Sequence, residues 1–188
     1  TTSNNFGFAL ASGDFNADGK TDLAVAAYQY STNTGRVYLF YNGSIITENA
    51  SGADVTITGE TTSNAFGYAL ISGDFNADSK TDLAVGAYAY SSTSGRAYIF
   101  YNDGSLPTTA AAADIIITGE TTSNNFGSSF ASGDFNADGK TDLAVGAYVY
   151  STSTGRVYIF ITEAKSEEAL LQFQSIGATN IIGNLEVR

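Results

Sequence analysis

The chain consists largely of three copies of one sequence, and this repeat limits its possible folds more than any other feature. The segment DFNADGKTD at 14–22 returns as DFNADSKTD at 74–82 and as DFNADGKTD at 134–142. Residues 1–42 are identical to residues 121–162 at 33 of 42 positions. Each unit of such an array is a small supersecondary structure that buries its apolar face against its neighbours. The sequence therefore predicts three copies of one structural unit.

Within a unit the pattern is that of strands rather than helices. In the first unit the apolar, β-branched or aromatic stretches are FALASGDF, DLAVAAY, RVYLFY and ADVTITGE, and ADIIITGE replaces the last of them in the second unit. Loops rich in Gly, Ser, Thr and Asn separate them. Four short strands per repeat predict an all-β fold, a β-propeller whose blades are four-stranded antiparallel sheets. A solenoid of sheets is the alternative, but its repeats are usually shorter.

Blades are expected at about 1–60, 61–120 and 121–162, and the third copy lacks a recognisable counterpart of ADIIITGE. Propellers typically have about four to eight blades, so three leave the ring incomplete unless a homo-oligomer or a longer parent chain closes it. The tail, 163–188, leaves the repeat: EAKSEEALLQF has a briefly helical pattern and IIGNLEVR resembles a strand. The tail either supplies the missing fourth strand or begins another domain.

The acidic loop carries oxygen ligands at alternating positions. Counted from its first aspartate, side-chain oxygens fall at positions 1, 3, 5 and 9, and the lysine at position 7 offers its backbone carbonyl. This alternation is typical of calcium loops, where glycine at position 6 permits a sharp turn. We expect about three Ca²⁺ per chain, because Ca²⁺ takes about six to eight oxygens and the chain lacks the histidine and cysteine that softer metals prefer. The expected ligands are Asp14, Asn16, Asp18, Lys20, Asp22, Asp74, Asn76, Asp78, Lys80, Asp82, Asp134, Asn136, Asp138, Lys140 and Asp142.

Charge repulsion gives a reason for a cation in these loops. Nine of the 19 acidic residues lie in the three loops, and neighbouring carboxylates repel by roughly 1–4 kcal/mol per pair at a surface-like dielectric. A solvated turn rich in Asp and Asn is the alternative for a single loop, but three copies in one register favour a metal. The second loop has Ser79 at position 6. We expect this loop to bind calcium most weakly, because a left-handed non-glycine residue costs about 1 kcal/mol or more.

Composition argues against several classes of function. Without histidine the chain lacks the commonest general base, and near-identical blades supply copies of one group rather than the unlike partners of an active site. We therefore expect no enzyme activity. The net charge of −11 argues against binding nucleic acid. No apolar run is long enough for a membrane-spanning helix.

The motifs NNFG, SGDFNADGKTDLAVGAY and GRVYIF together resemble the FG-GAP repeat of integrin α-subunit propellers and bacterial surface proteins. The resemblance covers about 160 of the 188 residues. The family's Gly-Ala-Pro is replaced by 26–28 Ala-Ala-Tyr and, at 86–88 and 146–148, by Gly-Ala-Tyr. The resemblance implies calcium loops on one face of a propeller that acts in adhesion or recognition, extracellularly or at the cell surface. The alternatives are a structural repeat that forms a ring or filament and, less favoured, a non-catalytic domain of a larger hydrolase.

A protein or glycan ligand is expected on the face opposite the calcium loops. The segments YQYSTNTG, YAYSSTSG and YVYSTSTG and the GETTSN linkers reach that face, and their Tyr, Ser, Thr and Asn content is typical of adaptable recognition surfaces. In the alternative interpretation, one tyrosine of each pair packs between blades. The candidate contact residues are Tyr28, Tyr30, Tyr88, Tyr90, Tyr148 and Tyr150.

Two further sets of side chains recur once in each repeat. The phenylalanines of the Phe-Gly pairs are expected in the core, because large aromatic side chains are usually buried. They are Phe6, Phe66 and Phe126. Arginines stand at 36, 96 and 156, at the start of each expected third strand. We expect them to form structural pairs with the glutamates at 60 and 120 rather than to bind a ligand.

Overall fold

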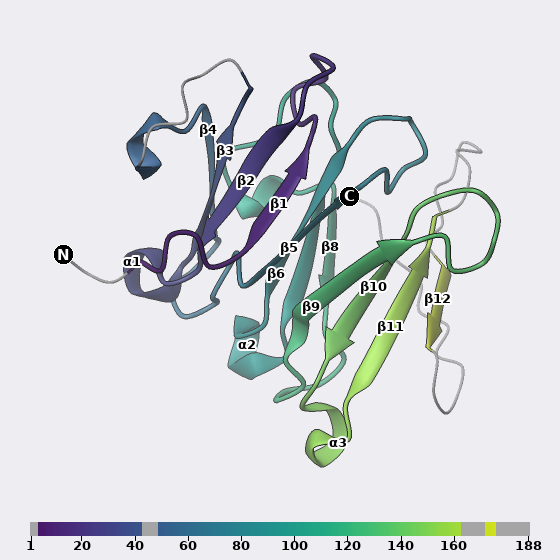
Figure 1. Ribbon diagram of the computed structural model, residues 1–188. Coiled ribbons are helices and arrows are strands. Elements are labelled where there is room, and N and C mark those ends of the chain that lie inside the picture. The colour runs from purple at the N-terminus through teal and green to yellow at the C-terminus, as the bar shows by residue number, and fades with distance from the viewer. Residues whose placement is uncertain (1–3, 43–48, 163–171, 176–188) are drawn as a thin grey trace.

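The computed structural model describes residues 4–42, 49–162 and 172–175. The fold is all-β, as the sequence predicts, and consists of three four-stranded antiparallel sheets that follow one another along the chain (Figure 1). The sheets correspond to the blades of a propeller, arranged as an open array rather than a closed ring. No helix among the described residues has the length and apolar character needed to cross a membrane.

Strands pair in chain order within each blade, so neighbours in sequence are neighbours in the sheet. The first blade contains β1 (Leu10–Gly13), β2 (Asp22–Ala27), β3 (Arg36–Phe40) and β4 (Val55–Thr58). The second contains β5 (Ala69–Gly73), β6 (Asp82–Ala87), β7 (Arg96–Phe100) and β8 (Ile115–Thr118). The third contains β9 (Phe126–Gly133), β10 (Asp142–Ala147), β11 (Arg156–Ile161) and β12 (Gln172–Ser175). Short 3₁₀ turns, η1 (Ala50–Gly52) and η2 (Ala110–Ala112), precede the fourth strands of the first two blades.

In the third blade, the fourth strand comes from the tail. β12 pairs antiparallel with β11, and Phe173 lies opposite Phe160 in the register. It takes the position that β4 and β8 have in the other sheets. The stretch with the helical pattern spans 163–173, and its last two residues belong to this strand. The rest of that stretch and the strand expected at 181–188 lie outside the described residues.

The apolar core lies between blades as well as within them. One cluster joins Phe15 and Leu39 of the first blade to Phe66 and Leu83 of the second, and another joins the second blade to the third. The middle blade is covered on both faces, so β6 is buried along its whole length. This explains why DLAVGA reads as a continuous apolar run rather than an alternating one.

Blade order also decides the burial of the Phe-Gly phenylalanines. Phe66 and Phe126 are 1% and 2% exposed, which confirms the expectation for both, but Phe6 is 44% exposed. Phe6 still meets Tyr38 edge to face at 5.4 Å, much as Phe66 meets Tyr98 at 5.3 Å. The expectation is wrong for Phe6 because a buried position also requires a preceding blade, and the first blade has none within the described residues.

Each blade has a short turn between its second and third strands that the sequence pattern does not predict. In α1 (Tyr30–Asn33) the φ angles of Ser31, Thr32 and Asn33 are 48°, 57° and 57°, so the turn is left-handed. The same backbone recurs in α2 (Tyr90–Thr93) and α3 (Tyr150–Ser153). A left-handed conformation costs about 1–2 kcal/mol for each non-glycine residue, so it needs support from its surroundings.

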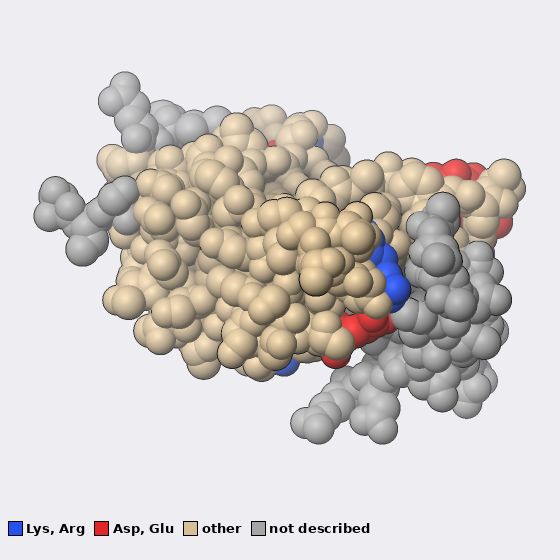
Figure 2. All heavy atoms as spheres, turned by 90° about the horizontal axis from the view of Figure 1, so that it is seen from below, with Lys and Arg blue, Asp and Glu red and all other residues tan. Residues whose placement is uncertain are grey.

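These three turns lie at one end of the blades, and the acidic loops lie at the other (Figure 1). Figure 2 views the molecule from below, the side of the turns, and the described surface there carries few charged side chains. The negative charge of the loops is therefore separated from this face.

Candidate metal-binding loops

Each acidic loop joins the first strand of its blade to the second. In the first loop, Asp14 accepts hydrogen bonds from the backbone N–H groups of Asp18 (3.0 Å, to Oδ1) and Gly19 (2.8 Å, to Oδ2). Asn16 Oδ1 also accepts from Asp18 N at 3.0 Å, and Asp18 Oδ1 accepts from Lys20 N at 2.9 Å. The side chains at positions 1, 3 and 5 are thus held against the backbone of the loop that carries them.

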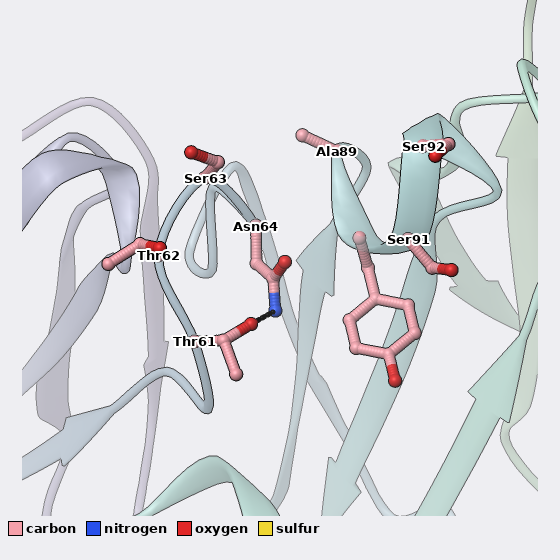
Figure 3. A pocket seen from close by; sticks show the side chains of 8 residues that line it. Thr61, Thr62, Ser63, Asn64, Ala89, Ser91 and Ser92 are labelled. Carbon is pink, nitrogen blue, oxygen red and sulfur yellow. Dashed lines mark hydrogen bonds between the residues drawn. The ribbon is translucent and has the colours of Figure 1, made fainter.

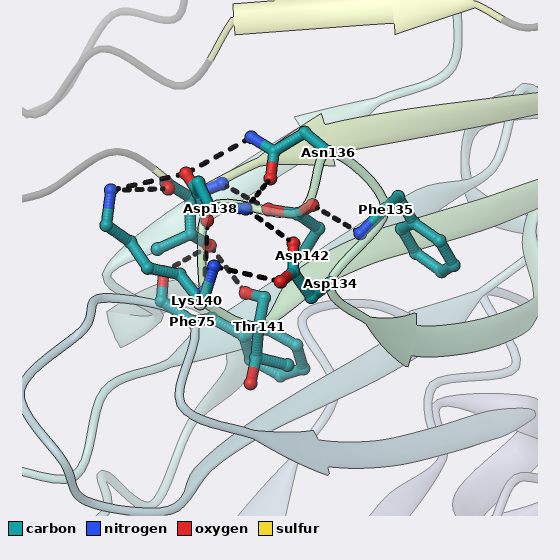
Figure 4. A network of polar contacts seen from close by, with 10 residues as sticks. Phe75, Asp134, Phe135, Asn136, Asp138, Lys140, Thr141 and Asp142 are labelled. Atoms are coloured by element: carbon teal, nitrogen blue, oxygen red, sulfur yellow. Dashed lines mark hydrogen bonds and ion pairs between the residues drawn. The ribbon is translucent and has the colours of Figure 1, made fainter.

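The same contacts recur in the other two loops. Asp74 accepts from Asp78 N at 3.0 Å and from Ser79 N at 2.8 Å. Figure 4 shows the third loop, where Asp134 accepts from Asp138 N at 3.0 Å and position 6 donates at 2.8 Å. Three loops with one pattern of hydrogen bonds show that the local sequence fixes this conformation.

Position 6 adopts a left-handed conformation in all three loops. The φ angles are 82° at Gly19, 85° at Gly139 and 68° at Ser79. The serine therefore keeps the glycine-like backbone at an energetic cost that the other loops avoid.

The aspartate at position 9 is buried and links two parts of its blade. Asp82 is 0% exposed. Its Oδ2 accepts from Phe75 N at 2.8 Å and its Oδ1 from Asn102 N at 2.9 Å. Asp22 and Asp142 make the equivalent pairs of bonds. The sequence places this residue in the loop but does not indicate its second partner, just after the third strand.

Electrostatics in the second loop disfavours uncompensated charge. Burial raises the pKa of Asp82 to about 7, and the negative charges of Asp78 and Asp74 raise it further. The backbone N–H bonds from Asn102 and Phe75 act in the opposite direction and lower this pKa. In the first and third loops, the lysine at position 7 offsets part of the negative charge. Lys20 Nζ lies 3.7 Å from an Asp18 carboxylate oxygen, and Lys140 Nζ lies 3.3 Å from one of Asp138. In the third loop, hydrogen bonds from Asn136 and Lys140 hold the pKa of Asp138 below its usual value.

The expected ligands thus share each loop, but their acidic groups do not already surround one point. Among the described residues, no three acidic side chains form a ready metal cluster. The donors are nevertheless all oxygens, which suits a hard cation. Each carboxylate has about four lone-pair sites, so accepting two N–H bonds leaves sites for a metal. The donor chemistry fits Ca²⁺, and coordination requires the side chains to turn within the loop.

The tyrosines on the opposite face are largely engaged within the protein. Tyr28 contacts Phe8 and Tyr68, with ring centres 4.4 and 5.3 Å apart, and Tyr68 contacts Tyr88 at 4.3 Å. This aromatic row crosses from the first blade to the second. Tyr148, by contrast, is 59% exposed.

The second tyrosine of each pair lies beneath an arginine. The guanidinium carbon is 3.9, 3.5 and 3.6 Å from the ring centre in the pairs Arg36–Tyr30, Arg96–Tyr90 and Arg156–Tyr150. Two of these arginines also reach a glutamate of the preceding blade, as expected: Arg96 pairs with Glu60 at 2.8 Å and Arg156 with Glu120 at 3.0 Å. Arg36 pairs with neither glutamate, contrary to the expectation for it, and donates from Nε to Thr58 Oγ1 at 3.0 Å, as Arg96 does to Thr118 Oγ1. One face of each of these rings is therefore already covered.

A hollow of about 340 Å³ opens on this face beside α2 (Figure 3). Residues 61–64 form one wall, where Asn64 Nδ2 donates to Thr61 Oγ1 at 2.8 Å, and residues 89–92 form the other. Hydroxyl groups, an amide and one tyrosine line it, without charged side chains. Such a surface suits a ligand that is recognised by hydrogen bonds.

Comparison with known proteins agrees with this architecture. The FG-GAP repeat model matches residues 6–40, 66–100 and 126–160, one match per blade. Integrin alpha-PS5 of Drosophila melanogaster is 34% identical over 162 residues, covering 82% of this chain and 15% of that protein. Phosphatidylinositol-glycan-specific phospholipase D of Bos taurus is 32% identical over 159 residues, covering 75% and 18%. The chain thus spans less than a fifth of the length of these relatives. With three matched repeats over more than half of its length, the chain belongs to the FG-GAP repeat family.

Proposed function

We propose that this chain is a calcium-binding, extracellular propeller module for recognition or adhesion. The observation that carries the proposal is the identical arrangement of oxygen donors in three loops, each kept in register by the same N–H bonds. The side chains at positions 1, 3, 5 and 9 and the carbonyl at position 7 would hold one Ca²⁺ per loop. Water would complete the coordination shell, because Ca²⁺ takes about six to eight oxygens.

Calcium would act here as a structural cation. It would relieve the repulsion that the charges of Asp74 and Asp78 exert on Asp82. Because Asp82 also holds the segment after β7 through Asn102, order in the loop would extend to that connection. Mg²⁺ fits less well, since it demands a stricter octahedral geometry and gives up its waters reluctantly.

We assign ligand recognition to the face opposite the acidic loops. The hollow between 61–64 and 89–92 offers hydroxyls and an amide, and Tyr148 offers an exposed ring. These groups suit a glycan or an uncharged protein surface. The integrin relatives support a protein ligand and a location outside the cell. The phospholipase D relative supports the second possibility, a non-catalytic module beside a hydrolase domain.

Isothermal titration with CaCl₂ after chelation tests the calcium sites. We expect about three Ca²⁺ per chain, and about two after Asp134→Asn, which removes the first ligand of one loop. Asp103→Asn is the matched control, because Asp103 is an exposed aspartate outside the loops. Absence of binding by the folded chain, or equal loss in both variants, would contradict the proposal.

A further inference from the structure

The residue just after the third strand of the second blade contacts two acidic loops rather than one. This residue is Asn102, which is 0% exposed. Its backbone N–H donates to Asp82 Oδ1 of the second loop at 2.9 Å. Its side-chain Nδ2 donates to the backbone carbonyl of Asp14, which opens the first loop, at 2.9 Å. One buried residue therefore connects position 9 of one loop with position 1 of the loop before it.

A third hydrogen bond fixes the direction of this amide. Gly104 N donates to Asn102 Oδ1 at 3.0 Å, so the oxygen of the amide is held by its own chain and the Nδ2 group faces the first loop. A buried polar group that loses its partner is costly, so the amide resists displacement. Its acceptor is the carbonyl of Asp14, the residue whose side chain is the expected first ligand of that loop.

The third blade repeats the connection with a different side chain. Thr162 is 3% exposed and donates its backbone N–H to Asp142 Oδ1 at 2.9 Å. Its hydroxyl lies 3.3 Å from Phe75 O, at position 2 of the second loop, and 2.7 Å from Thr141 O of its own loop. A hydroxyl has a single hydrogen to donate, and the shorter contact is the one within its own blade. The second and third loops are therefore connected more weakly than the first and second.

Apolar contacts join the same pairs of loops. A Cβ added to Gly13, just before the first loop, would lie 2.3 Å from Thr81 Cγ2, at position 8 of the second loop. At the next boundary, a Cβ added to Gly73 would lie 2.9 Å from Thr141 Cγ2. Neighbouring loops thus touch one another, and a movement in one is felt by the next.

These contacts give Asn102 a part in two of the proposed calcium sites. Coordination requires the acidic side chains to turn within each loop, and calcium in the second loop would hold Asp82 in one position. Asp82 in turn holds Asn102, whose amide holds the backbone of Asp14. We propose that Asn102 is a positioning residue shared by the first two loops, through which calcium in one loop strengthens binding in the other. This inference rests on the proposed calcium binding.

The sign of the coupling follows from the order that the shared residue imposes. The first ion to bind orders Asn102, so the second ion meets a loop that loses less conformational entropy on binding. The coupling is reciprocal, since each loop must change the affinity of the other by the same factor. Repulsion between two bound cations acts in the opposite direction, but salt screens exposed charges within about 8 Å at physiological ionic strength. We therefore expect positive coupling, larger between the first and second loops than between the second and third.

NMR titration with CaCl₂ in about 0.15 M KCl follows each loop separately. The backbone amides at position 6 report on the three loops, and they belong to Gly19, Ser79 and Gly139. Asp74→Asn removes the first ligand of the second loop. It should raise the calcium dissociation constant of the first loop at least about fivefold, the lower end of typical coupling between sites. The third loop should respond less, because Thr162 forms the weaker connection.

Asn102→Ala tests whether the amide carries the effect. The variant keeps the backbone N–H that bonds to Asp82 and removes the side-chain bond to Asp14. In this background Asp74→Asn should no longer change the affinity of the first loop. The comparison also cancels the charge that Asp74→Asn removes, since that charge is lost in both backgrounds. A merely structural role of Asn102 would weaken binding without removing the dependence of one loop on the other.

Two more variants complete the design. Asn42→Ala is the matched control, because Asn42 donates the equivalent backbone N–H to Asp22 Oδ1 but follows the first blade. The dependence of the first loop on the second should persist in it. Circular dichroism checks folding, and where Asn102→Ala does not fold, Asn102→Thr introduces the residue type of the third blade. The coupling should then fall to the level found between the second and third loops.

The outcomes separate the coupling from calcium binding itself. Calcium binding in all loops, with a first loop whose affinity ignores Asp74→Asn, would overturn the coupling and leave the proposed function standing. An effect of Asp74→Asn that persists unchanged in the Asn102→Ala background would overturn the role of Asn102. The absence of calcium-dependent shifts in every loop would overturn both this inference and the proposed function.

Discussion

Arg96 donates from Nη1 to Glu60 Oε2 at 2.8 Å across the boundary between the first and second blades. The arginine also lies over Tyr90, at 3.5 Å from the ring centre. Both charged side chains are largely shielded from solvent, at 16% and 18% exposure. The pair therefore ties one blade to the next by more than a surface salt bridge normally would.

A double-mutant cycle of Glu60→Gln and Arg96→Met tests this pair. We expect a coupling of about 1 kcal/mol in the free energy of unfolding, since the contact is charge-assisted but still partly solvated. Urea denaturation of the four proteins measures it. The same cycle between Glu60 and Arg36, which is paired with neither glutamate in the described chain, serves as the control and should be additive. Additivity in both cycles would refute the assigned role.

Phe66→Ala and Phe6→Ala form a matched pair at the same position of the repeat. Phe66 is buried between blades, so its truncation should cost about 3–5 kcal/mol of unfolding free energy. Phe6 is 44% exposed, so its truncation should lower the free energy of unfolding much less. The comparison is made by urea denaturation of both variants under the same conditions. Equal losses would contradict the difference in burial between the two phenylalanines.

Asp82→Asn should destabilise the second blade even without calcium. The carboxylate accepts two backbone N–H bonds, and an amide offers only one oxygen, so one buried donor loses its partner. We expect a loss of about 1–3 kcal/mol in chelator, measured by denaturation. Asp103→Asn should leave stability unchanged. A neutral effect of Asp82→Asn would contradict this prediction, because relief of the charge repulsion around this buried carboxylate would then fully offset the lost bond.

Ser79→Gly should strengthen the second calcium loop, and Gly139→Ser should weaken the third. Ser79 holds a φ of 68°, close to the 85° of Gly139. Each exchange should shift the free energy of unfolding by about 1 kcal/mol, in opposite directions. Calcium titration of the two variants then shows whether the site affinities change in the same order. Shifts in the same direction would exclude backbone strain as the cause.

The strands and the acidic loops could be predicted because their signals are local. DLAVGA is apolar throughout, and β6 is buried throughout. The oxygen donors alternate along the loop, and their N–H partners lie within the same loop. The position-9 aspartates can be recognised as loop members for the same reason.

Features that depend on a neighbouring blade could not be predicted in this way. Phe6 and Phe66 have the same local sequence but are 44% and 1% exposed, because among the described residues only Phe66 packs against a preceding blade. The left-handed turns of Ser and Thr have no glycine to signal them within the turn. In the first two blades these turns also accept N–H groups of the segment that enters the next blade, such as that of Ala65, which donates to Asn33 O. The third blade forms the same turn without this contact among the described residues, so the contact is not its cause. β12 lacks the repeat sequence of the other fourth strands and is recognised only by its pairing.

Native mass spectrometry before and after chelation measures the calcium content of the chain and tests whether the three acidic loops bind it. Each chain should carry about three Ca²⁺ in calcium buffer and none after chelation, and the chelated protein should unfold at a lower temperature, because a ligand that binds only the folded state stabilises it. A folded chain that retains no Ca²⁺, with the same melting temperature in both buffers, would contradict the assignment of the DFNADGKTD loops.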